Sequence, residues 1–183
     1  DGKKTSNDIK DEIAHEVNSI ISNGDRPPHL AAVIVGNDGA SLTYVGSKVR
    51  ACEKVGFDST LVSLEDSISE QELLDKVYEL NNDKKIDGYI VQLPLPEHID
   101  TQKVLLAVDP KKDVDGFHPV NFGRMALNLP TFISATPNGI MELLKRYEVP
   151  TEGKNTIVIG RSDIVGKPVS IFCLLYTSPS PRD

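Results

Sequence analysis

Three polar residues, Ser41, Tyr44 and Lys48, are spaced so that they follow one another along one side of a helix. Residues three or four positions apart are neighbours on a helix surface, so a hydroxyl, a phenol and an amine would share one edge. Such a set can bind a substrate and move protons, and we expect it to face the rim of a cleft. An ordinary solvated helix edge is the alternative, and it is the commoner outcome for an isolated Tyr and Lys pair.

Gln92 is a polar amide at the end of an apolar stretch, in the run YIVQLPLP at residues 89–96. We expect residues 88–93 to form a strand that stops at Pro94, because proline cannot donate to a strand ladder. Ligands of open parallel sheets gather at the carboxyl ends of the strands, which is where Gln92 would lie. The alternative is a glutamine at a strand edge before a rigid turn.

The acidic run DVDG at residues 113–116 has the composition of a ligand-binding loop. Aligned as the middle of a calcium-binding EF-hand loop, it puts Lys111 at the first ligand position and Phe122 at the twelfth, which removes two essential oxygen donors. Calcium is therefore rejected, and the four histidines have no ligand-like spacing that would suggest another metal. A carboxylate here could accept paired hydrogen bonds from the amino and ring N–H groups of a heterocycle, and a plain polar loop is the alternative.

A glycine-containing turn, GRSDIVGKP at residues 160–168, lies between a β-branched stretch and an apolar run. This is the setting of a phosphate-binding turn at a helix N-terminus. It fits neither standard pattern, since Ser162 and Val165 replace two glycines of G-x-G-x-x-G and Pro168 replaces the hydroxyl residue of a P-loop. Arg161 could pair with a ribose 2′-phosphate, which favours NADP over NAD. The turn follows the Tyr-x-x-x-Lys pair, whereas short-chain dehydrogenases carry their glycine loop before that pair, so the order argues against that class.

Hydrophobic periodicity and capping residues place these groups on alternating elements. Helices are expected at residues 9–21, 41–55, 69–80, 100–108 and 136–147, and strands at residues 30–35, 60–64, 88–93 and 156–159. The second helix should bury a stripe made of Leu42, Val45, Val49 and Cys52. The expected helix starts are a capping box of Ser69 with Glu72, a cap at Asp100, and a cap at Thr136 followed by Pro137. Between the last two helices we expect a polar loop to about Phe122.

Strands that alternate with helices predict an α/β fold, because parallel neighbours need a crossover connection and a helix is the usual one. We expect a substrate domain at residues 1–136, with a parallel sheet and flanking helices. Residues 137–171 would form a linking helix and the start of an incomplete Rossmann-like cofactor domain, whose phosphate-binding turn is the one at residues 160–168.

Composition excludes several classes of protein. The 183 residues carry 20 basic and 27 acidic side chains, a net charge of −7, and no basic run that could follow a nucleic-acid backbone. No apolar run approaches the roughly 20 residues of a membrane-spanning helix, and no signal or transit peptide is visible, so we expect a cytoplasmic protein. Cys52 and Cys173 have no partners at zinc-ligand spacing and are interpreted as buried thiols.

Five ordered blocks together resemble the bifunctional FolD family, the methylenetetrahydrofolate dehydrogenase/methenyltetrahydrofolate cyclohydrolases. The blocks are residues 40–48 with Tyr-x-x-x-Lys, VQLPLP at residues 91–96, KDVDG at residues 112–116, ATPNG at residues 135–139, and GRSDIVGKP at residues 160–168. The resemblance covers residues 1 to about 171. It implies an enzyme of one-carbon metabolism, linked to purine biosynthesis, that oxidises 5,10-methylenetetrahydrofolate with NADP and hydrolyses the methenyl product to 10-formyltetrahydrofolate.

The resemblance also assigns roles to residues. It implies that Lys48 is catalytic, that Tyr44 and Gln92 position it and the folate, and that Asp115 holds the pterin. The other implied contacts are Val91, Leu93 and Pro94 for the folate, and Thr136, Gly160, Arg161, Ser162 and Gly166 for NADP. A small-molecule tetrahydrofolate is the implied partner, without nucleic acid or membrane, and the full-length family implies a homodimer. One departure is Ala135, where many members carry Cys.

The last stretch, residues 172–183, does not resemble the family, which continues through further strands and helices. We interpret it as a non-native tail and expect the chain to stop inside the cofactor domain, so that it is not a working dehydrogenase. Two alternatives to the bifunctional enzyme stay open. One is another NADP-dependent two-domain α/β enzyme, and the other is a non-catalytic fragment that binds folate or nucleotide.

Overall fold

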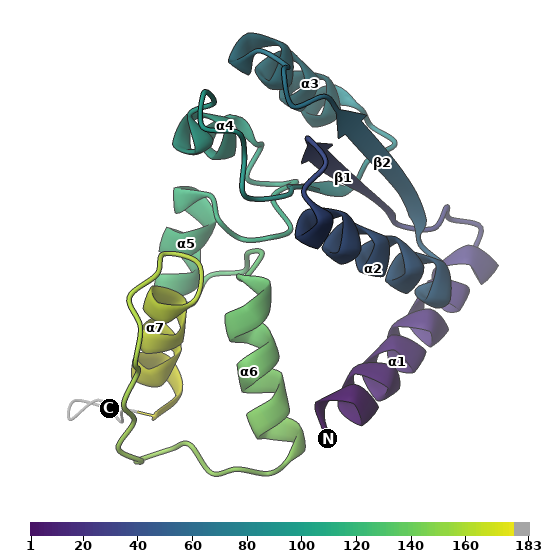
Figure 1. The fold of residues 1–183 in the computed structure, drawn as a ribbon. Helices are drawn as coiled ribbons and strands as arrows, with labels where there is room; N and C mark the ends of the chain where they lie inside the picture. The colour runs from purple at the N-terminus through teal and green to yellow at the C-terminus, as the bar shows by residue number, and fades with distance from the viewer. Residues whose placement is uncertain (178–183) are drawn as a thin grey trace. The chain divides into compact units, whose positions relative to one another are not determined.

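The computed structural model describes residues 1–177, and the elements of this part of the chain alternate helix and strand in its first half (Figure 1). In chain order they are α1 (Gly2–Ser22), β1 (His29–Val35), α2 (Gly39–Val55), β2 (Asp58–Leu64), α3 (Glu70–Asn82), β3 (Gly88–Val91), α4 (Thr101–Ala107), α5 (Pro119–Ala126), α6 (Ala135–Arg146) and α7 (Gly166–Thr177). Residues 178–183 of the expected tail lie outside the described part.

The chain divides into two compact units, one that reaches from Lys3 to Asp113 and one that begins at Val114. The first holds the three strands with α2, α3 and α4, and the second holds α5, α6 and α7. The expected α/β class is confirmed. The expected domain boundary after residue 136 differs from this division into compact units and stays a prediction.

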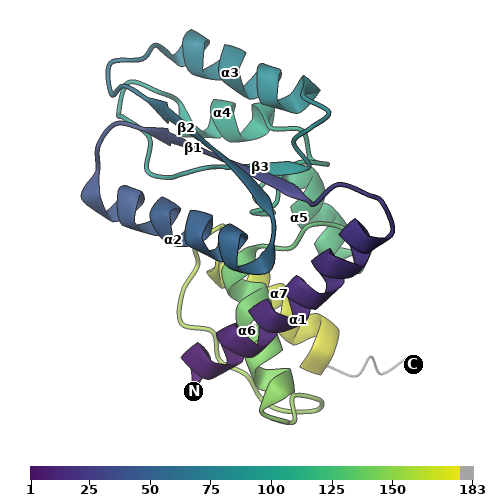
Figure 2. The same ribbon diagram turned by 90° about the vertical axis from the view of Figure 1, so that its right-hand side faces the viewer.

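The sheet of the first unit has the order β2-β1-β3, and both pairs are parallel. The central strand β1 is buried from Ala31 to Val35, which explains why its sequence is continuously apolar. Figure 2 shows α3 and α4 over one face of the sheet and α2 over the other. The edge strand β2 is more exposed, with Leu61 at 48%.

The core of the first unit lies between β1, β3, α3 and α4. Its fully buried members include Ala31 and Val33 of β1, Leu73 and Val77 of α3, and Val104 of α4. Each side chain of this size gains about 1.5–3 kcal/mol from burial, or less for alanine, so these contacts fix the face that each helix presents to the sheet. The carboxyl ends of β1 and β3 are thereby held beside each other.

Local capping explains three helix starts of the first unit, two of which were expected. The Asp38 carboxylate accepts a hydrogen bond from Ser41 N at 2.8 Å, which begins α2 two residues earlier than expected. Ser69 and Glu72 form the expected capping box of α3. The Asp100 carboxylate accepts from Lys103 N at 3.1 Å and begins α4.

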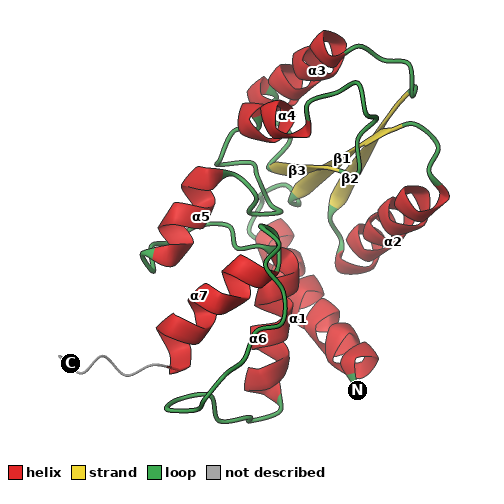
Figure 3. Cartoon of the chain, turned by 60° about the vertical axis from the view of Figure 1, so that its left-hand side comes forward, coloured by secondary structure: helices red, strands yellow, loops and turns green. Residues whose placement is uncertain are grey.

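Three expectations for the second unit were wrong. The expected loop to Phe122 contains α5, whose first turn has Pro119 and is capped by His118. Thr136 is not the cap of α6, because that helix begins at Ala135 with Ser134 as its N-cap residue. Residues 156–159 form no strand, and Figure 3 shows the chain between α6 and α7 as loop. Ile157 and Ile159 are 87% and 98% exposed.

Two further observations concern the two cysteines and the apolar length of the helices. Cys52 is buried as expected, whereas Cys173, which was also expected to be buried, is only half-buried. Among residues 1–177, no helix is long and apolar enough to cross a membrane.

Candidate functional site

Gln92 lies at the carboxyl edge of the sheet, as its place in the sequence predicts. The strand β3 ends at Val91, two residues earlier than expected, but Gln92 N still donates to Val33 O at 2.9 Å. The Gln92 amide then turns back, and its Nε2 donates to Leu93 O at 2.8 Å. This bond orients the side chain so that its Oε1 is available as an acceptor.

Lys48 of α2 reaches the same edge. Its Nζ donates to Gln92 Oε1 at 3.4 Å, between half-buried side chains that are 44 residues apart in the chain. The distance is near the long limit of a hydrogen bond, so the contact is weak and the amine can move toward a ligand. The structure therefore brings together an amine and an amide oxygen at the position where parallel sheets bind their ligands.

Ser41 and Tyr44, the other two polar residues expected along one side of α2, differ in their exposure. Tyr44 is 66% exposed, whereas Ser41 is 5% exposed and packs inside. The expected buried stripe was wrong for Leu42, which is 44% exposed, because the buried side of α2 is centred on Ser41, Val45 and Cys52 and Leu42 lies about 60–80° around the helix from the last two. Ser41 thus does not face a cleft rim, and a substrate contact for Tyr44 stays a prediction.

The neighbours of Gln92 differ in their exposure. Val91 is 5% exposed and belongs to the core, Leu93 is half-buried, and Pro94 is exposed. Their expected contacts with a substrate stay predictions. Of these residues, Pro94 presents the most surface to solvent.

The acidic run at residues 113–116 spans the end of the first unit and the start of the second. Asp113 is 5% exposed and lies in a parallel bridge with Tyr89. Asp115 is half-buried and begins a turn at Gly116, whose φ is +66°. A Cβ at Gly116 would lie 2.6 Å from Ser134 N and 2.7 Å from Ile133 C, so only glycine fits this turn.

The turn at residues 160–166 precedes α7 and is organised by Ser162. Its Oγ accepts from Val165 N at 3.2 Å and from Gly166 N at 3.1 Å, and its carbonyl accepts from Lys167 N at 3.0 Å. A Cβ at Gly166 would lie 2.7 Å from Gly160 C and O, so the two glycines let the backbone fold tightly on itself. The turn also contacts α6, because Ser134 Oγ donates to Ile164 O at 2.7 Å.

The donor groups of this turn suit the phosphate groups of a nucleotide. Arg161 is exposed, so its guanidinium can pair with a phosphate, and the N-terminus of α7 carries partial positive charge although Gly166 N and Lys167 N already donate to Ser162. Thr136, at the start of α6, is also exposed. The residues present therefore fit the anionic end of a dinucleotide, although the strand expected before the turn is absent.

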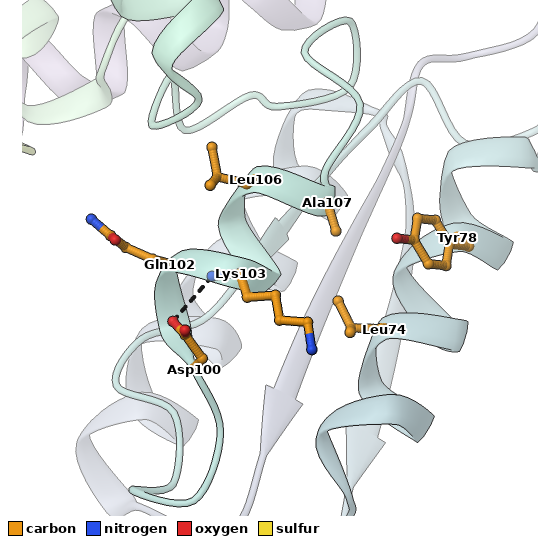
Figure 4. Close-up of a pocket in the computed structure, with 7 residues that line it drawn as sticks. All are labelled: Leu74, Tyr78, Asp100, Gln102, Lys103, Leu106 and Ala107. Atoms are coloured by element: carbon orange, nitrogen blue, oxygen red, sulfur yellow. Dashed lines mark hydrogen bonds between the residues drawn. The ribbon is translucent and has the colours of Figure 1, made fainter.

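The described residues also form a groove that involves neither Lys48, nor Gln92, nor the turn at residues 160–166, and they hold no cluster of metal ligands. A groove of about 440 Å³ lies between α3 and α4 (Figure 4), lined by Leu74, Tyr78, Asp100, Gln102, Lys103, Leu106 and Ala107. None of the expected site residues lines it. No cluster of three His, Cys, Asp or Glu side chains within residues 1–177 could hold a metal ion.

The sequence did not single out one buried polar group, the hydroxyl of Tyr89 on the strand that leads to Gln92. The Tyr89 hydroxyl donates to Asn81 Oδ1 at 2.7 Å, and Tyr89 is 1% exposed. Burial raises the pKa of this hydroxyl, and the carboxylates of Asp109 and Asp113 raise it further. Tyr89 therefore remains a protonated donor. An isolated Tyr in an apolar strand gives no sequence signal for this role.

Comparison with family models divides the chain in the same order as the expected domains. Residues 1–115 match the model of the tetrahydrofolate dehydrogenase/cyclohydrolase catalytic domain. Residues 134–178 match the model of the NAD(P)-binding domain of the same proteins.

Relatives and solved structures agree with these matches. The chain is 71% identical, over all of its 183 residues, to the bifunctional protein FolD of Flavobacterium johnsoniae, of which it spans 61%. It is 42% identical to the bifunctional FolD methylenetetrahydrofolate dehydrogenase/cyclohydrolase of Campylobacter jejuni, with a TM-score of 0.94 over 97% of this chain and 63% of that one. It is 32% identical to the Trypanosoma brucei enzyme complexed with NADP and inhibitor, with a TM-score of 0.92 over 97% of this chain and 61% of that one.

Proposed function

The chain belongs to the tetrahydrofolate dehydrogenase/cyclohydrolase family, and we propose that it binds a tetrahydrofolate at the carboxyl edge of its sheet and transfers protons there. The reaction is the hydrolysis of 5,10-methenyltetrahydrofolate to 10-formyltetrahydrofolate, which in the whole protein follows the oxidation of 5,10-methylenetetrahydrofolate. The observation that carries this proposal is the contact of Lys48 Nζ with Gln92 Oε1. The chain spans about 61% of the length of the Flavobacterium relative, so the two activities are proposed for the protein as a whole.

Lys48 is proposed as the base of the hydrolysis. A lysine with an ordinary pKa near 10.4 is neutral in only about one molecule in a thousand at pH 7.4, so an amine acts as a base only where its charged form is disfavoured. The substrate itself supplies this effect. A methenyl cation about 4 Å from an ammonium opposes it by roughly 4 kcal/mol at an effective dielectric constant near 20.

The proton transfer follows from this arrangement. A water molecule attacks the methenyl carbon between N5 and N10, and the amine of Lys48 accepts the proton that the water loses. The bond from that carbon to N5 then breaks as the hydroxyl group of the adduct loses its proton to become the formyl C=O, N5 takes up one proton, and the formyl group stays on N10, so that one proton is released overall. Gln92 Oε1 accepts a hydrogen bond from the Lys48 amine and holds it at the reacting carbon. Tyr44, which is exposed on the same helix, is proposed to contact the folate.

Asp115 is proposed to hold the pterin ring. A carboxylate accepts two parallel N–H bonds, which matches the amino and ring N–H groups of a pterin. The turn at Gly116 fixes the backbone that carries this side chain, because glycine is required there. The backbone beside Gln92 and Pro94 is proposed to line the rest of the folate site.

The cofactor proposed for the oxidation is NADP. When bound, it supplies the acceptor for the hydride that leaves the one-carbon bridge. Arg161 would pair with the 2′-phosphate, and the hydroxyl of Ser162, next to the positive end of α7, would donate to another phosphate group. Thr136, Gly160 and Gly166 are proposed to lie against the cofactor because they surround the same turn.

The same family membership leads us to propose a cytoplasmic location and a homodimer for the whole protein. A second candidate function is binding of folate or nucleotide without turnover. It is favoured by residues 156–159, which form no strand and include the exposed Ile157 and Ile159, whereas a nucleotide-binding fold has a paired strand before its phosphate-binding turn.

The test compares two variants of the 183-residue chain with a control, using the loss of methenyltetrahydrofolate absorbance and the binding of tetrahydrofolate. We expect Lys48→Met to lower the rate of hydrolysis by about 100-fold or more, the scale of general base catalysis, while folate binding is retained. Asp115→Ala should weaken folate binding by about 10- to 150-fold, because the desolvated pterin donors lose a charged acceptor. The control is Lys54→Met, on the same helix as Lys48, which removes an exposed ion pair with Asp11 of α1.

Three results would decide between the candidates. Hydrolysis by Lys48→Met at the rate of the unchanged chain would exclude Lys48 as the base. Unchanged folate affinity in Asp115→Ala would assign Asp115 to an ordinary polar loop. Tight folate binding by a chain that never hydrolyses the methenyl compound would favour the binding function over the catalytic one.

A further inference from the structure

The segment that joins α4 to Asp115, residues 107–113, is held to the sheet by its backbone. Tyr89 N of β3 donates to Lys112 O at 2.9 Å, and Tyr89 pairs with Asp113 in a parallel bridge. The end of the 107–113 segment therefore continues the sheet past β3. Because this backbone pairing is short, side chains must help to hold the 107–113 segment beside β3.

Lys112 attaches the 107–113 segment to the end of α3. Its ammonium donates to Leu80 O at 2.8 Å and to Asp83 O at 2.6 Å. These carbonyls belong to the last turn and the C-cap of α3, where a helix carries partial negative charge, and α3 has no basic residue in its own last turn. Lys112 supplies the missing cation from a position about 30 residues further along the chain.

Asn81 attaches the same segment at its other end. Its Oδ1 accepts from Asp109 N at 2.8 Å and from the Tyr89 hydroxyl at 2.7 Å, and its Nδ2 donates to Ala107 O at 2.8 Å. The amide oxygen thus accepts two bonds, and the amide nitrogen donates one. Because Tyr89 is buried, its bond also fixes the orientation of the Asn81 amide.

We propose that Lys112, Asn81 and Tyr89 are positioning residues for folate binding, because they hold the 107–113 segment to α3 and β3 immediately before Asp115. This inference rests on the proposed function, in which Asp115 binds the pterin. Two residues span at most about 7 Å, so a fixed Asp113 confines the backbone of Asp115 to a small region. Lys112 lies in the same run as Asp115 but directs its ammonium to α3, so it acts on the folate through the backbone and not as a ligand.

The experiment uses Lys112→Met and, as the matched control, Lys111→Met, which removes the same charge from the exposed neighbouring residue. The first readout is amide hydrogen exchange without ligand. We expect peptides that cover residues 107–115 to exchange about tenfold faster in Lys112→Met, while β1 peptides and the Lys111→Met variant keep their original rates. Unchanged exchange in residues 107–115 would overturn the proposal, whether or not the chain binds folate.

The second readout is tetrahydrofolate affinity, together with the KM and kcat of methenyltetrahydrofolate hydrolysis. We expect Lys112→Met to raise the dissociation constant and KM by about tenfold and to leave kcat within about twofold, because binding geometry changes while Lys48 and Gln92 do not. Lys112→Arg, which keeps a charged donor, should recover most of the affinity. Faster exchange with unchanged affinity would show that the attachment is only structural and would overturn the positioning role. Absence of folate binding in the unchanged chain would instead reject the proposed function.

Discussion

Gly116→Ala should destabilise the second unit more than an alanine at any other glycine of that unit. The added Cβ would lie 2.6 Å from Ser134 N, 2.7 Å from Ile133 C and 3.1 Å from Phe132 O, all of them backbone atoms that cannot rotate away. The left-handed conformation, with φ at +66°, costs alanine about 1–2 kcal/mol and the steric overlap about 1–3 kcal/mol more. We therefore expect a loss of about 2–5 kcal/mol, which is comparable with the whole stability of a small unit.

The matched control is Gly139→Ala in α6, where a Cβ meets nothing within 4 Å. Alanine in a helix interior is favoured over glycine by about 0.8–1 kcal/mol, so this change should slow local opening while Gly116→Ala accelerates it. Because the chain divides into two units, stability is best read locally, from amide hydrogen exchange of α5 and α6 compared with β1. Equal effects of the two variants, or a loss below about 0.5 kcal/mol for Gly116→Ala, would refute the steric argument.

Two further predictions concern the first unit. Ser69→Ala removes the capping box of α3 and should lower the free energy of unfolding by about 1 kcal/mol, whereas Ser67→Ala, at an exposed residue, should change it by less than about 0.5 kcal/mol. The hydrogen bonds of Asp87 with Arg26 hold its pKa below the ordinary value of 3.8, so its stabilising effect is present above that pH and disappears as the pH falls through the lower folded-state pKa. Asp87→Asn should therefore lower the melting temperature at pH 7, and thermal melts should show this difference shrinking below about pH 4. A difference that grows toward acid would contradict the assignment.

The fold of the first unit was predictable because its signals are local and agree with one another. The capping box at Ser69, the cap at Asp100 and the continuous apolar run of β1 each define an element without reference to distant residues. The parallel order then follows from the helices between the strands. The main error was Leu42 in α2, because the small polar residue Ser41 takes the place on the buried side that the larger apolar Leu42 was expected to fill.

The second unit was less predictable because its signals depend on partners outside each element. Gly123 lowers the helical propensity of α5, and His118 is an unusual cap, so the sequence of that helix reads as a loop. The backbone N–H groups of a first helical turn have no partner within the helix, so a proline fits at any position of that turn. Pro137 therefore does not determine the residue at which α6 begins. The β-branched residues 156–159 have the composition of a strand, but a strand needs a hydrogen-bonded neighbour, and the three paired strands of the described residues all lie in the first unit.

The same distinction applies to the candidate site. The contact of Lys48 with Gln92 was expected from the resemblance to the FolD family, and the topology is consistent with it because one residue lies on the helix after β1 and the other at the end of β3. The contacts of Asn81 and Lys112 could not be predicted, because they depend on the length of the loop after α4 and on which carbonyls at the end of α3 remain available. Residue type identifies a group that can transfer a proton, but a positioning residue is defined by the atoms that surround it. An Asn on a helix and a Lys in a loop are ordinary surface residues in the sequence, and their role is apparent only from the hydrogen bonds that join α3, β3 and the 107–113 segment.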